Sequence, residues 1–247
     1  MVRRVEILPD LQALVDRAYE EVILLLEDAI AKRGSATFVL AGGGTPKPLY
    51  EKLAQSALPW SKIHLFWGDE RYVPEDHPDS NYRMAREALI DRITIPWENI
   101  HPMPTAGGDP AADAALHAAH ISDFFQLLPG EPLQIPQLDV VLLGMGDDGH
   151  TASLFPGTEA LQVCDALVTV GEKSGQPRLT FTYPLLNQAR TVLFMVAGEN
   201  KQTALQQVFS PDGSNETYPS RAVSAQENLI WLLDSAAGKG IPVQEKQ

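Results

Sequence analysis

Apolar residues first recur along the chain with a helical period and then gather into short continuous runs. From Asp10 to Gly34 they return every three or four positions, which predicts a long amphipathic helix with Asp10 as its N-cap and Gly34 at its C-terminal end. Four later runs are apolar throughout and rich in β-branched or aromatic residues. They predict buried strands at residues 37–41, 63–68, 138–143 and 191–198.

Amphipathic segments alternate with these runs. They predict helices at residues 46–54, 80–91, 109–128 and 199–209, and shorter strands at residues 99–103, 178–182 and 229–233. Apolar strands that alternate with helices are typical of an α/β fold with a doubly wound, mostly parallel sheet and helices on both faces. We expect one domain over residues 1–247, because no segment has the character of a domain linker.

Ligands of such sheets bind at the carboxyl ends of the strands. The loops that follow Ala41, Trp67, Leu143 and Ala197 are therefore the places where we expect chemistry.

Charge and cysteine content narrow the classes of partner. Acidic residues outnumber basic ones by 32 to 19, and the formal net charge of −13 argues against nucleic-acid and anionic-membrane partners. A small phosphorylated substrate stays possible if Arg, Lys and backbone N–H groups cluster locally. Cys164 is the only cysteine, so an intrachain disulfide and a Cys-based zinc site are excluded. With no apolar signal-peptide core and no run of membrane-span length, we expect a cytoplasmic protein.

The loop GMGDDG, residues 144–149, matches the dinucleotide-binding pattern G-x-G-x-x-G directly after a predicted strand. However, Asp147 and Asp148 would repel a pyrophosphate, and Pro156 interrupts the helix that should follow. The other interpretation is a glycine-rich turn from strand to helix, in which HTASLF begins the helix. His150 then lies near the carboxyl edge of the sheet, either as a structural residue or as a general acid or base.

Two further loops carry candidate anion ligands. AGGGTP, residues 41–46, resembles an anion cradle because its glycines let the backbone approach a ligand, although an ordinary turn is the alternative. In GDER, residues 68–71, Arg71 can bind a phosphate or pair with an acidic neighbour.

Other kinds of site find little support. The chain contains no Walker A spacing, no G-x-S-x-G and no H-E-x-x-H, which speaks against nucleotide hydrolysis, a serine esterase and that class of zinc hydrolase. His117 and His120 lie three positions apart on a predicted helix, and we expect both to face solvent.

Four segments together resemble, in this order, the motifs of the 6-phosphogluconolactonase family. They are AGGGTPKPLYEKL (41–53), FWGDERYVPEDHPDSNYRMAREALI (66–90), LDVVLLGMGDDGHTASLFPGT (138–158) and KSGQPRLTFTYPLLNQARTVLFMVAGENK (173–201). The resemblance implies a Rossmann-like fold related to glucosamine-6-phosphate deaminases and ribose-5-phosphate isomerases. It also implies hydrolysis of 6-phospho-D-glucono-1,5-lactone in the oxidative pentose phosphate pathway without metal or cofactor, and functional coupling to glucose-6-phosphate dehydrogenase, which makes that substrate.

The resemblance also implies roles for individual residues. His150 corresponds to the base that activates water, and Asp69 and Arg71 to the acid and arginine of GDER. Phosphate ligands are expected among Arg71, Lys173 and Lys201, and Arg178, which corresponds to the arginine of the family's R-[VIL]-T motif, is expected to bind substrate. The loop with Gly43, Gly44 and Thr45 is expected to be a cradle or oxyanion donor. Either Asp148 or Asp69 is expected to orient His150. Ser174 and Gly175 depart from the family pattern, in which prolines are usual at these positions.

Three rival functions stay open at this point. Glucosamine-6-phosphate deaminases share the fold but have D-E-Y and G-H-I-A-F-N-E-P, whereas this chain has Asp69-Glu70-Arg71 and GHTASLFP, without the second motif's Glu. A non-catalytic sugar-phosphate sensor would be expected to lack the base at position 150, and His150 is present. A dinucleotide oxidoreductase would bind NAD or NADP at GMGDDG.

Overall fold

A seven-stranded parallel sheet forms the centre of the molecule. The computed structural model describes residues 1–128 and 133–241. The strand order of the large sheet is β1-β10-β9-β6-β2-β3-β5. Its strands are β1 (Val2–Leu8), β2 (Ala36–Leu40), β3 (Ile63–Trp67), β5 (Ile100–His101), β6 (Val140–Leu143), β9 (Thr191–Val196) and β10 (Asn228–Asp234).

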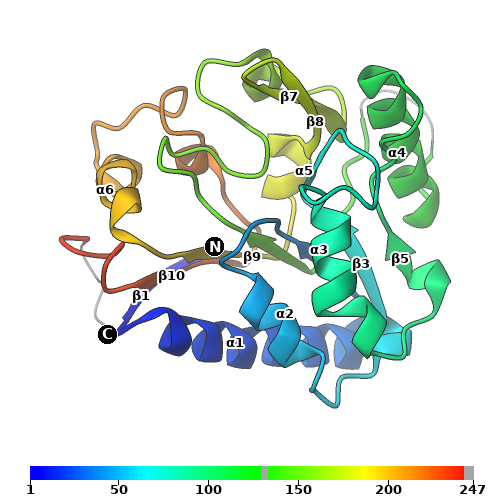
Figure 1. Cartoon of the computed structure of the whole chain (residues 1–247), viewed down its shortest axis with the longest axis horizontal. Helices are drawn as coiled ribbons and strands as arrows, with labels where there is room; N and C mark the ends of the chain where they lie inside the picture. Colours follow the sequence, from blue (N-terminus) through cyan, green and yellow to red (C-terminus); the bar gives the residue numbers. More distant parts are fainter. Residues whose placement is uncertain (129–132, 242–247) are drawn as a thin grey trace.

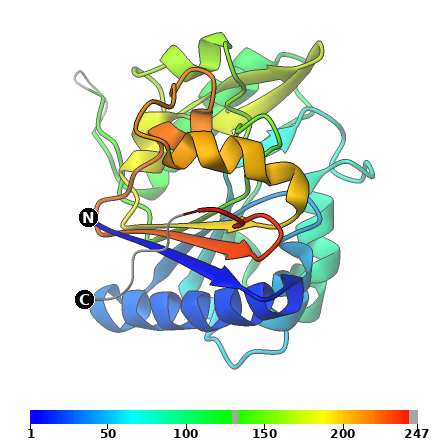
Figure 2. The same cartoon turned by 90° about the vertical axis from the view of Figure 1, so that its left-hand side faces the viewer.

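Helices cover both faces of this sheet, and a second, smaller sheet lies over one of them (Figures 1 and 2). On one face lie α1 (Leu11–Arg33), α2 (Lys47–Leu53) and α3 (Asn81–Ala88). On the other face lie α4 (Pro110–Phe124), α5 (Tyr183–Asn187) and α6 (Gln202–Phe209). The small antiparallel sheet has the order β4-β8-β7, from β4 (Asp69–Arg71), β8 (Gln176–Phe181) and β7 (Val168–Lys173).

Each strand of the large sheet contributes to two cores, because its side chains alternate between the faces. In β9, Phe194 and Val196 belong to the core beneath α6 and the small sheet, whereas Leu193 and Met195 belong to the core beneath α1 and α2. Burial on both faces explains why this strand is apolar throughout. The prediction of a doubly wound, mostly parallel sheet is confirmed.

Gly68 connects the two sheets. It follows β3 of the large sheet and precedes β4 of the small one. Its N–H donates to the carbonyl of Leu40 in the large sheet at 3.1 Å, and its carbonyl accepts from the N–H of Phe181 in the small sheet at 2.8 Å. The loop after β3 therefore begins at the junction of the two layers.

Several elements differ from the sequence predictions. The strand predicted at residues 178–182 lies in the small antiparallel sheet, and β1, β4 and β7 were not predicted. The helix expected to begin at HTASLF is wrong, since residues 151–158 form turns. Ala152 has φ 47° there, a left-handed conformation that a right-handed helix cannot contain. The helix predicted at 109–128 ends at Phe124.

No helix in the part of the chain that the structure describes is long and apolar enough to cross a membrane.

Candidate active site

A cavity of about 250 Å³ opens at the carboxyl ends of β2, β3, β6 and β9. Its wall includes the loops that follow Leu40, Trp67, Leu143 and Val196, in the region where the sheet topology predicted chemistry. Of the residues that the sequence singled out, eight line it: Gly43, Gly44, Thr45, Asp69, Arg71, His150, Arg178 and Lys201. Asp148 and Lys173 do not belong to the wall.

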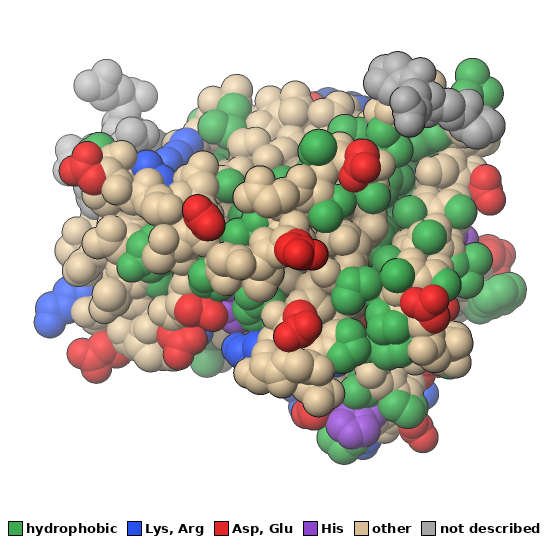
Figure 3. Space-filling model, turned by 90° about the horizontal axis from the view of Figure 1, so that it is seen from above, with side chains coloured by type: hydrophobic (Ala, Val, Ile, Leu, Met, Phe, Trp, Pro, Cys, Tyr) green, Lys and Arg blue, Asp and Glu red, His purple; other side chains and the backbone are tan. Residues whose placement is uncertain are grey.

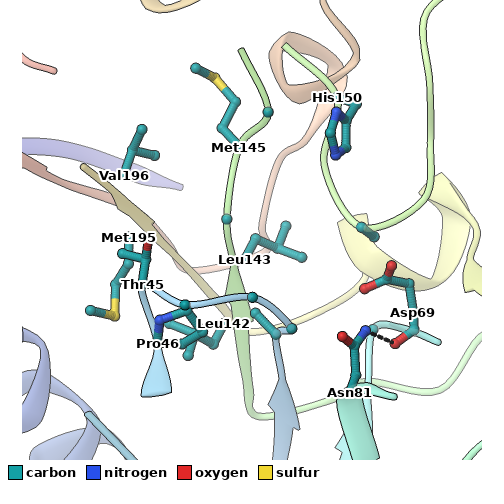
Figure 4. A pocket seen from close by; sticks show the side chains of 18 of the residues that line it. Thr45, Pro46, Asp69, Asn81, Leu142, Leu143, Met145, His150, Met195 and Val196 are labelled. Carbon is teal, nitrogen blue, oxygen red and sulfur yellow. Dashed lines mark hydrogen bonds between the residues drawn. The ribbon is translucent and has the colours of Figure 1, made fainter. Parts of the chain in front are cut away.

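The His150 side chain lies in the cavity wall and is oriented by Asp148 (Figure 4). Its Nδ1 lies 2.5 Å from Asp148 Oδ1, and the same oxygen accepts the His150 backbone N–H at 3.0 Å. The ring also packs on Phe155, with centroids 4.4 Å apart. Because an ionised carboxylate only accepts hydrogen bonds, Nδ1 carries a hydrogen, and in the neutral imidazole the lone pair therefore lies on Nε2.

Asp148 is ionised at neutral pH. Burial raises the pKa of this carboxyl, but the hydrogen bonds from His150 and the positive charges of the protonated His150 ring and of Lys173 outweigh it and lower the pKa to about 2. A charged acceptor is thereby held against the imidazole. Of the two acids considered for orienting His150, Asp148 makes the contact.

Gly146 explains why a glycine pattern occurs in this loop. A Cβ at position 146 would lie 2.1 Å from His150 Nδ1 and 2.6 Å from Asp148 Oδ1. Gly149 has φ 81°, a conformation that side chains rarely adopt. Both glycines are therefore accounted for by the turn that places His150, and the space that a pyrophosphate would need above Gly146 is filled by the imidazole. This geometry disfavours the dinucleotide interpretation of GMGDDG.

Asp69 is held by a residue of the same turn. Its Oδ2 accepts a hydrogen bond from Ser153 Oγ at 2.6 Å, and Ser153 is fully buried three positions after His150. The backbone N–H of Ser153 donates to Thr180 Oγ1 at 3.1 Å, and Thr180 faces Asp69 across the β4–β8 pair. Asp69 is 7% exposed and lines the cavity.

Arg71 and Arg178 are direct neighbours in the antiparallel register of β4 and β8. The Nε atoms of both are buried without a hydrogen-bond partner, and neither side chain forms an ion pair with any residue that the structure describes. Arg71 Nη1 donates to the carbonyl of Asp79 at 2.5 Å. Burial lowers the pKa of Arg178, Asp69 raises it, and the charge of Arg71 lowers it further. Two adjacent guanidinium groups without carboxylate partners are suited to bind an anion.

The two lysines differ in position. Lys201 lies in the cavity wall, at the end of a 3₁₀ turn over residues 199–201. Lys173 lies at the end of β7, where its Nζ is 5.4 Å from the centroid of Phe155; the guanidinium carbon of Arg178 lies at the same distance from that ring. Ser174 and Gly175 have φ 54° and 77°, as in a two-residue β-hairpin turn. Proline cannot adopt positive φ, which explains why this chain departs from the proline-containing pattern.

Acidic side chains are dispersed over the face that carries the small sheet, and few basic side chains are seen there (Figure 3). The cationic groups of the site are thus a local feature in a chain with a formal net charge of −13.

Three residues near the cavity were not singled out from the sequence. Asn81 lines the cavity and is 2% exposed, Glu70 is 3% exposed directly beside Arg71, and Ser153 contacts Asp69. Glu70 lies within the GDER motif and Asn81 within the same segment that carried the resemblance, but the sequence assigned neither of them a role in the site. The expectation that His117 faces solvent is wrong, since it is 1% exposed beneath the small sheet, whereas His120 is exposed.

Comparison with known proteins identifies relatives along nearly the whole chain. The family described as glucosamine-6-phosphate isomerases/6-phosphogluconolactonase matches residues 9–231. A 6-phosphogluconolactonase of Nostoc sp. (strain PCC 7120) is 56% identical over 243 residues, which cover 98% of this chain and 100% of the relative. The structure of a 6-phosphogluconolactonase from Thermotoga maritima superposes with a TM-score of 0.82 at 33% identity, over 95% of this chain and 100% of that one. A monomeric glucosamine-6-phosphate deaminase shares the fold, with a TM-score of 0.77 at 20% identity over 95% of this chain and 98% of that one.

Proposed function

Because the chain belongs to the family of glucosamine-6-phosphate isomerases and 6-phosphogluconolactonases and is a lactone-hydrolysing enzyme, we propose that it hydrolyses 6-phospho-D-glucono-1,5-lactone through water activated by His150. The observation that carries this mechanism is the His150–Asp148 pair, in which Nδ1 is held at 2.5 Å from a carboxylate and Nε2 is left as a base in the cavity wall. The product is 6-phospho-D-gluconate.

The proposed reaction needs one base and no covalent intermediate. Nε2 of His150 takes a proton from water while the water oxygen bonds to C1 of the lactone. When the bond between C1 and the ring oxygen breaks, the imidazolium returns the proton to that oxygen. A δ-lactone is an activated ester, so a positioned base that contributes about 10² to 10⁴ in rate is sufficient.

The backbone of the glycine loop is our proposed partner for the carbonyl oxygen. This oxygen gains negative charge as water attacks, and a donor aimed at it contributes about 3 kcal/mol. Gly43 and Gly44 line the cavity, and a Cβ at either position would have no atom within 4 Å, so their surfaces open onto free space. We assign their N–H groups, beside Thr45, to this role.

Arg71 and Arg178 are the proposed ligands of the substrate phosphate, with Lys201 on the cavity wall and Lys173 beside Phe155. The phosphate is remote from the bond that breaks, so its binding energy serves to hold C1 in register with His150. Because both guanidinium groups lack carboxylate partners among the described residues, no ion pair has to be broken when the phosphate binds.

The test is the rate at which the protein accelerates the decay of freshly generated lactone above its spontaneous hydrolysis. We expect the wild type to be active and His150→Ala to lose about 10² or more in kcat while keeping its circular dichroism spectrum. A fully active His150→Ala variant would refute the base. Absence of acceleration by the wild type would refute the substrate, and release of ammonia from glucosamine 6-phosphate would then favour the deaminase alternative.

A further inference from the structure

Asn81 joins two parts of the site that lie far apart in the sequence. It is the first residue of α3, is 2% exposed and lines the cavity. Its side-chain Nδ2 donates to the backbone carbonyl of Asp69 at 2.9 Å (Figure 4, dashed line). Asn81 is thereby tied to β4, the strand that carries the proposed acid and the proposed phosphate ligand Arg71.

The other end of the same amide contacts the glycine loop. The carbonyl of Asp69 can only accept, so the Nδ2 group must face it and Oδ1 must point away. A Cβ built on Gly42 would lie 2.0 Å from Asn81 Oδ1, which means that a hydrogen on the Gly42 Cα points at this oxygen. Asn81 Oδ1 has no N–H or O–H donor among the described residues, so this weak Cα–H contact is its partner.

Glu70 fixes the backbone from which this amide extends. Its Oε1 accepts from the N–H groups of Arg71 and Asn81 at 2.8 and 2.7 Å, and its Oε2 accepts from the N–H of Tyr82 at 2.7 Å and from Ser80 Oγ at 3.2 Å. A buried carboxylate with four donors has little freedom to move. The start of α3 is thus locked onto β4, and the Asn81 amide reaches the glycine loop from a rigid base.

We propose that Asn81 is a positioning residue that sets the glycine loop at its catalytic distance from β4. The inference rests on the proposed function, in which the N–H groups of Gly43 and Gly44 stabilise the lactone oxygen while Arg71 and Arg178 bind the phosphate. Loss of the Asn81 amide releases the loop but leaves both arginines on paired strands. The effect therefore falls on kcat and spares KM.

The first experiment is steady-state kinetics of Asn81→Ala with 6-phosphogluconolactone. We expect kcat to fall by about 10-fold to 100-fold, because a misplaced oxyanion donor should cost part of what its complete removal costs. KM should stay within about threefold of the wild type. Asn81→Asp keeps the side-chain shape and Oδ1 but loses the donor to the Asp69 carbonyl. Its kcat should therefore fall as far as that of Asn81→Ala. A kcat within about threefold of the wild type, or a rise confined to KM, would overturn the proposal.

The second experiment tests the contact itself by a double-mutant cycle with Gly42. The φ of Gly42 lies outside the left-handed region, and the three atoms nearest to an added Cβ all belong to the Asn81 side chain. Gly42→Ala should therefore lower kcat about 10-fold or more in the wild type and less than about twofold in the Asn81→Ala background. Equal effects in both backgrounds would contradict the proposal even if Asn81→Ala is poorly active.

Urea unfolding of each variant separates misfolding from misplacement of the loop. The cycle requires Asn81→Ala and the double variant to unfold cooperatively, and a matched loss of stability and kcat in every variant would mean that the role is structural only. A wild type that does not accelerate lactone decay overturns both proposals. An active wild type with an unaffected Asn81→Ala variant overturns the positioning role alone.

Discussion

Buried His117 should make the stability of this protein sensitive to mild acid. The residue lies on α4 with 1% of its surface exposed, and its ring stacks on Phe181 of the small sheet, with centroids 6.3 Å apart. Its Nε2 has no hydrogen-bond partner among the described residues. Burial, and further the neighbouring His120 and His101, lower the pKa of His117 from 6.5 to about 3.

The sign of the effect follows from which state binds the proton. Between pH 6.5 and about 3 the unfolded chain protonates His117 and the folded chain does not, so the free energy of unfolding falls as the pH falls through this window. Each pH unit corresponds to about 1.36 kcal/mol, so lowering the pH from 7 to 5 removes about 2 kcal/mol through this residue. For a domain with a total stability of about 5–15 kcal/mol, this loss is readily measured.

The assay is urea unfolding followed by tryptophan fluorescence at pH 7, 6 and 5, for the wild type and His117→Phe. Phenylalanine keeps an aromatic ring on Phe181 and removes the titration. His101, whose pKa burial and the neighbouring His120 and His64 lower to about 4, stays in both proteins, so only the difference between the two pH dependences reports on His117.

We expect the wild type to lose about 2 kcal/mol more than His117→Phe between pH 7 and pH 5. Leu116→Ala, at an exposed position of the same helix, adds and removes no charge and should follow the wild type. Equal losses in the wild type and His117→Phe would refute the reasoning, because they would show that His117 binds its proton equally well in both states.

Two further substitutions test individual parts of the site. Arg178→Gln should lower kcat/KM for the phosphorylated lactone by about 10-fold to 100-fold, because one of the two guanidinium groups that hold the remote phosphate, and through it C1, is lost. An unchanged kcat/KM in steady-state kinetics would contradict this prediction. Gly146→Ala should lower kcat by about 10-fold or more, because the added Cβ would lie 2.1 Å from His150 Nδ1 and would displace the ring. Full activity of this variant in the lactone assay would show that the imidazole does not need its observed position.

The sequence predicts those parts of the fold that depend on local patterns of apolar residues. Strands such as β6 and β9 are apolar throughout because both of their faces are buried, and that pattern is visible without knowing what covers them. The location of the cavity followed from the same strands, since parallel strands bring their carboxyl ends to one edge. By contrast, β4 is a polar segment of three residues that is a strand only because β8 pairs with it.

The remaining errors come from contacts between segments distant in sequence. His117 lies on an alanine-rich helix whose pattern does not mark one side as buried, and its environment depends on Phe181 of β8, 64 positions later. Asn81 is part of the site only because α3 folds back onto β4 through Glu70. Residues 151–158 form turns instead of the expected helix because Ser153 donates hydrogen bonds to Asp69 and Thr180 of the small sheet.

Because Gly68 joins the two sheets, residues of both layers line the cavity. The glycine loop and the ends of β6 and β9 belong to the large sheet, whereas Asp69, Arg71 and Arg178 belong to the small one. A ligand that touches both walls acts as a removable cross-link, since separating the layers requires its release. At a free concentration of 100 times its dissociation constant, such a ligand stabilises the joined state by about 2.7 kcal/mol. Ligand binding in the cavity is therefore expected to make any separation of the small sheet from the large one rarer.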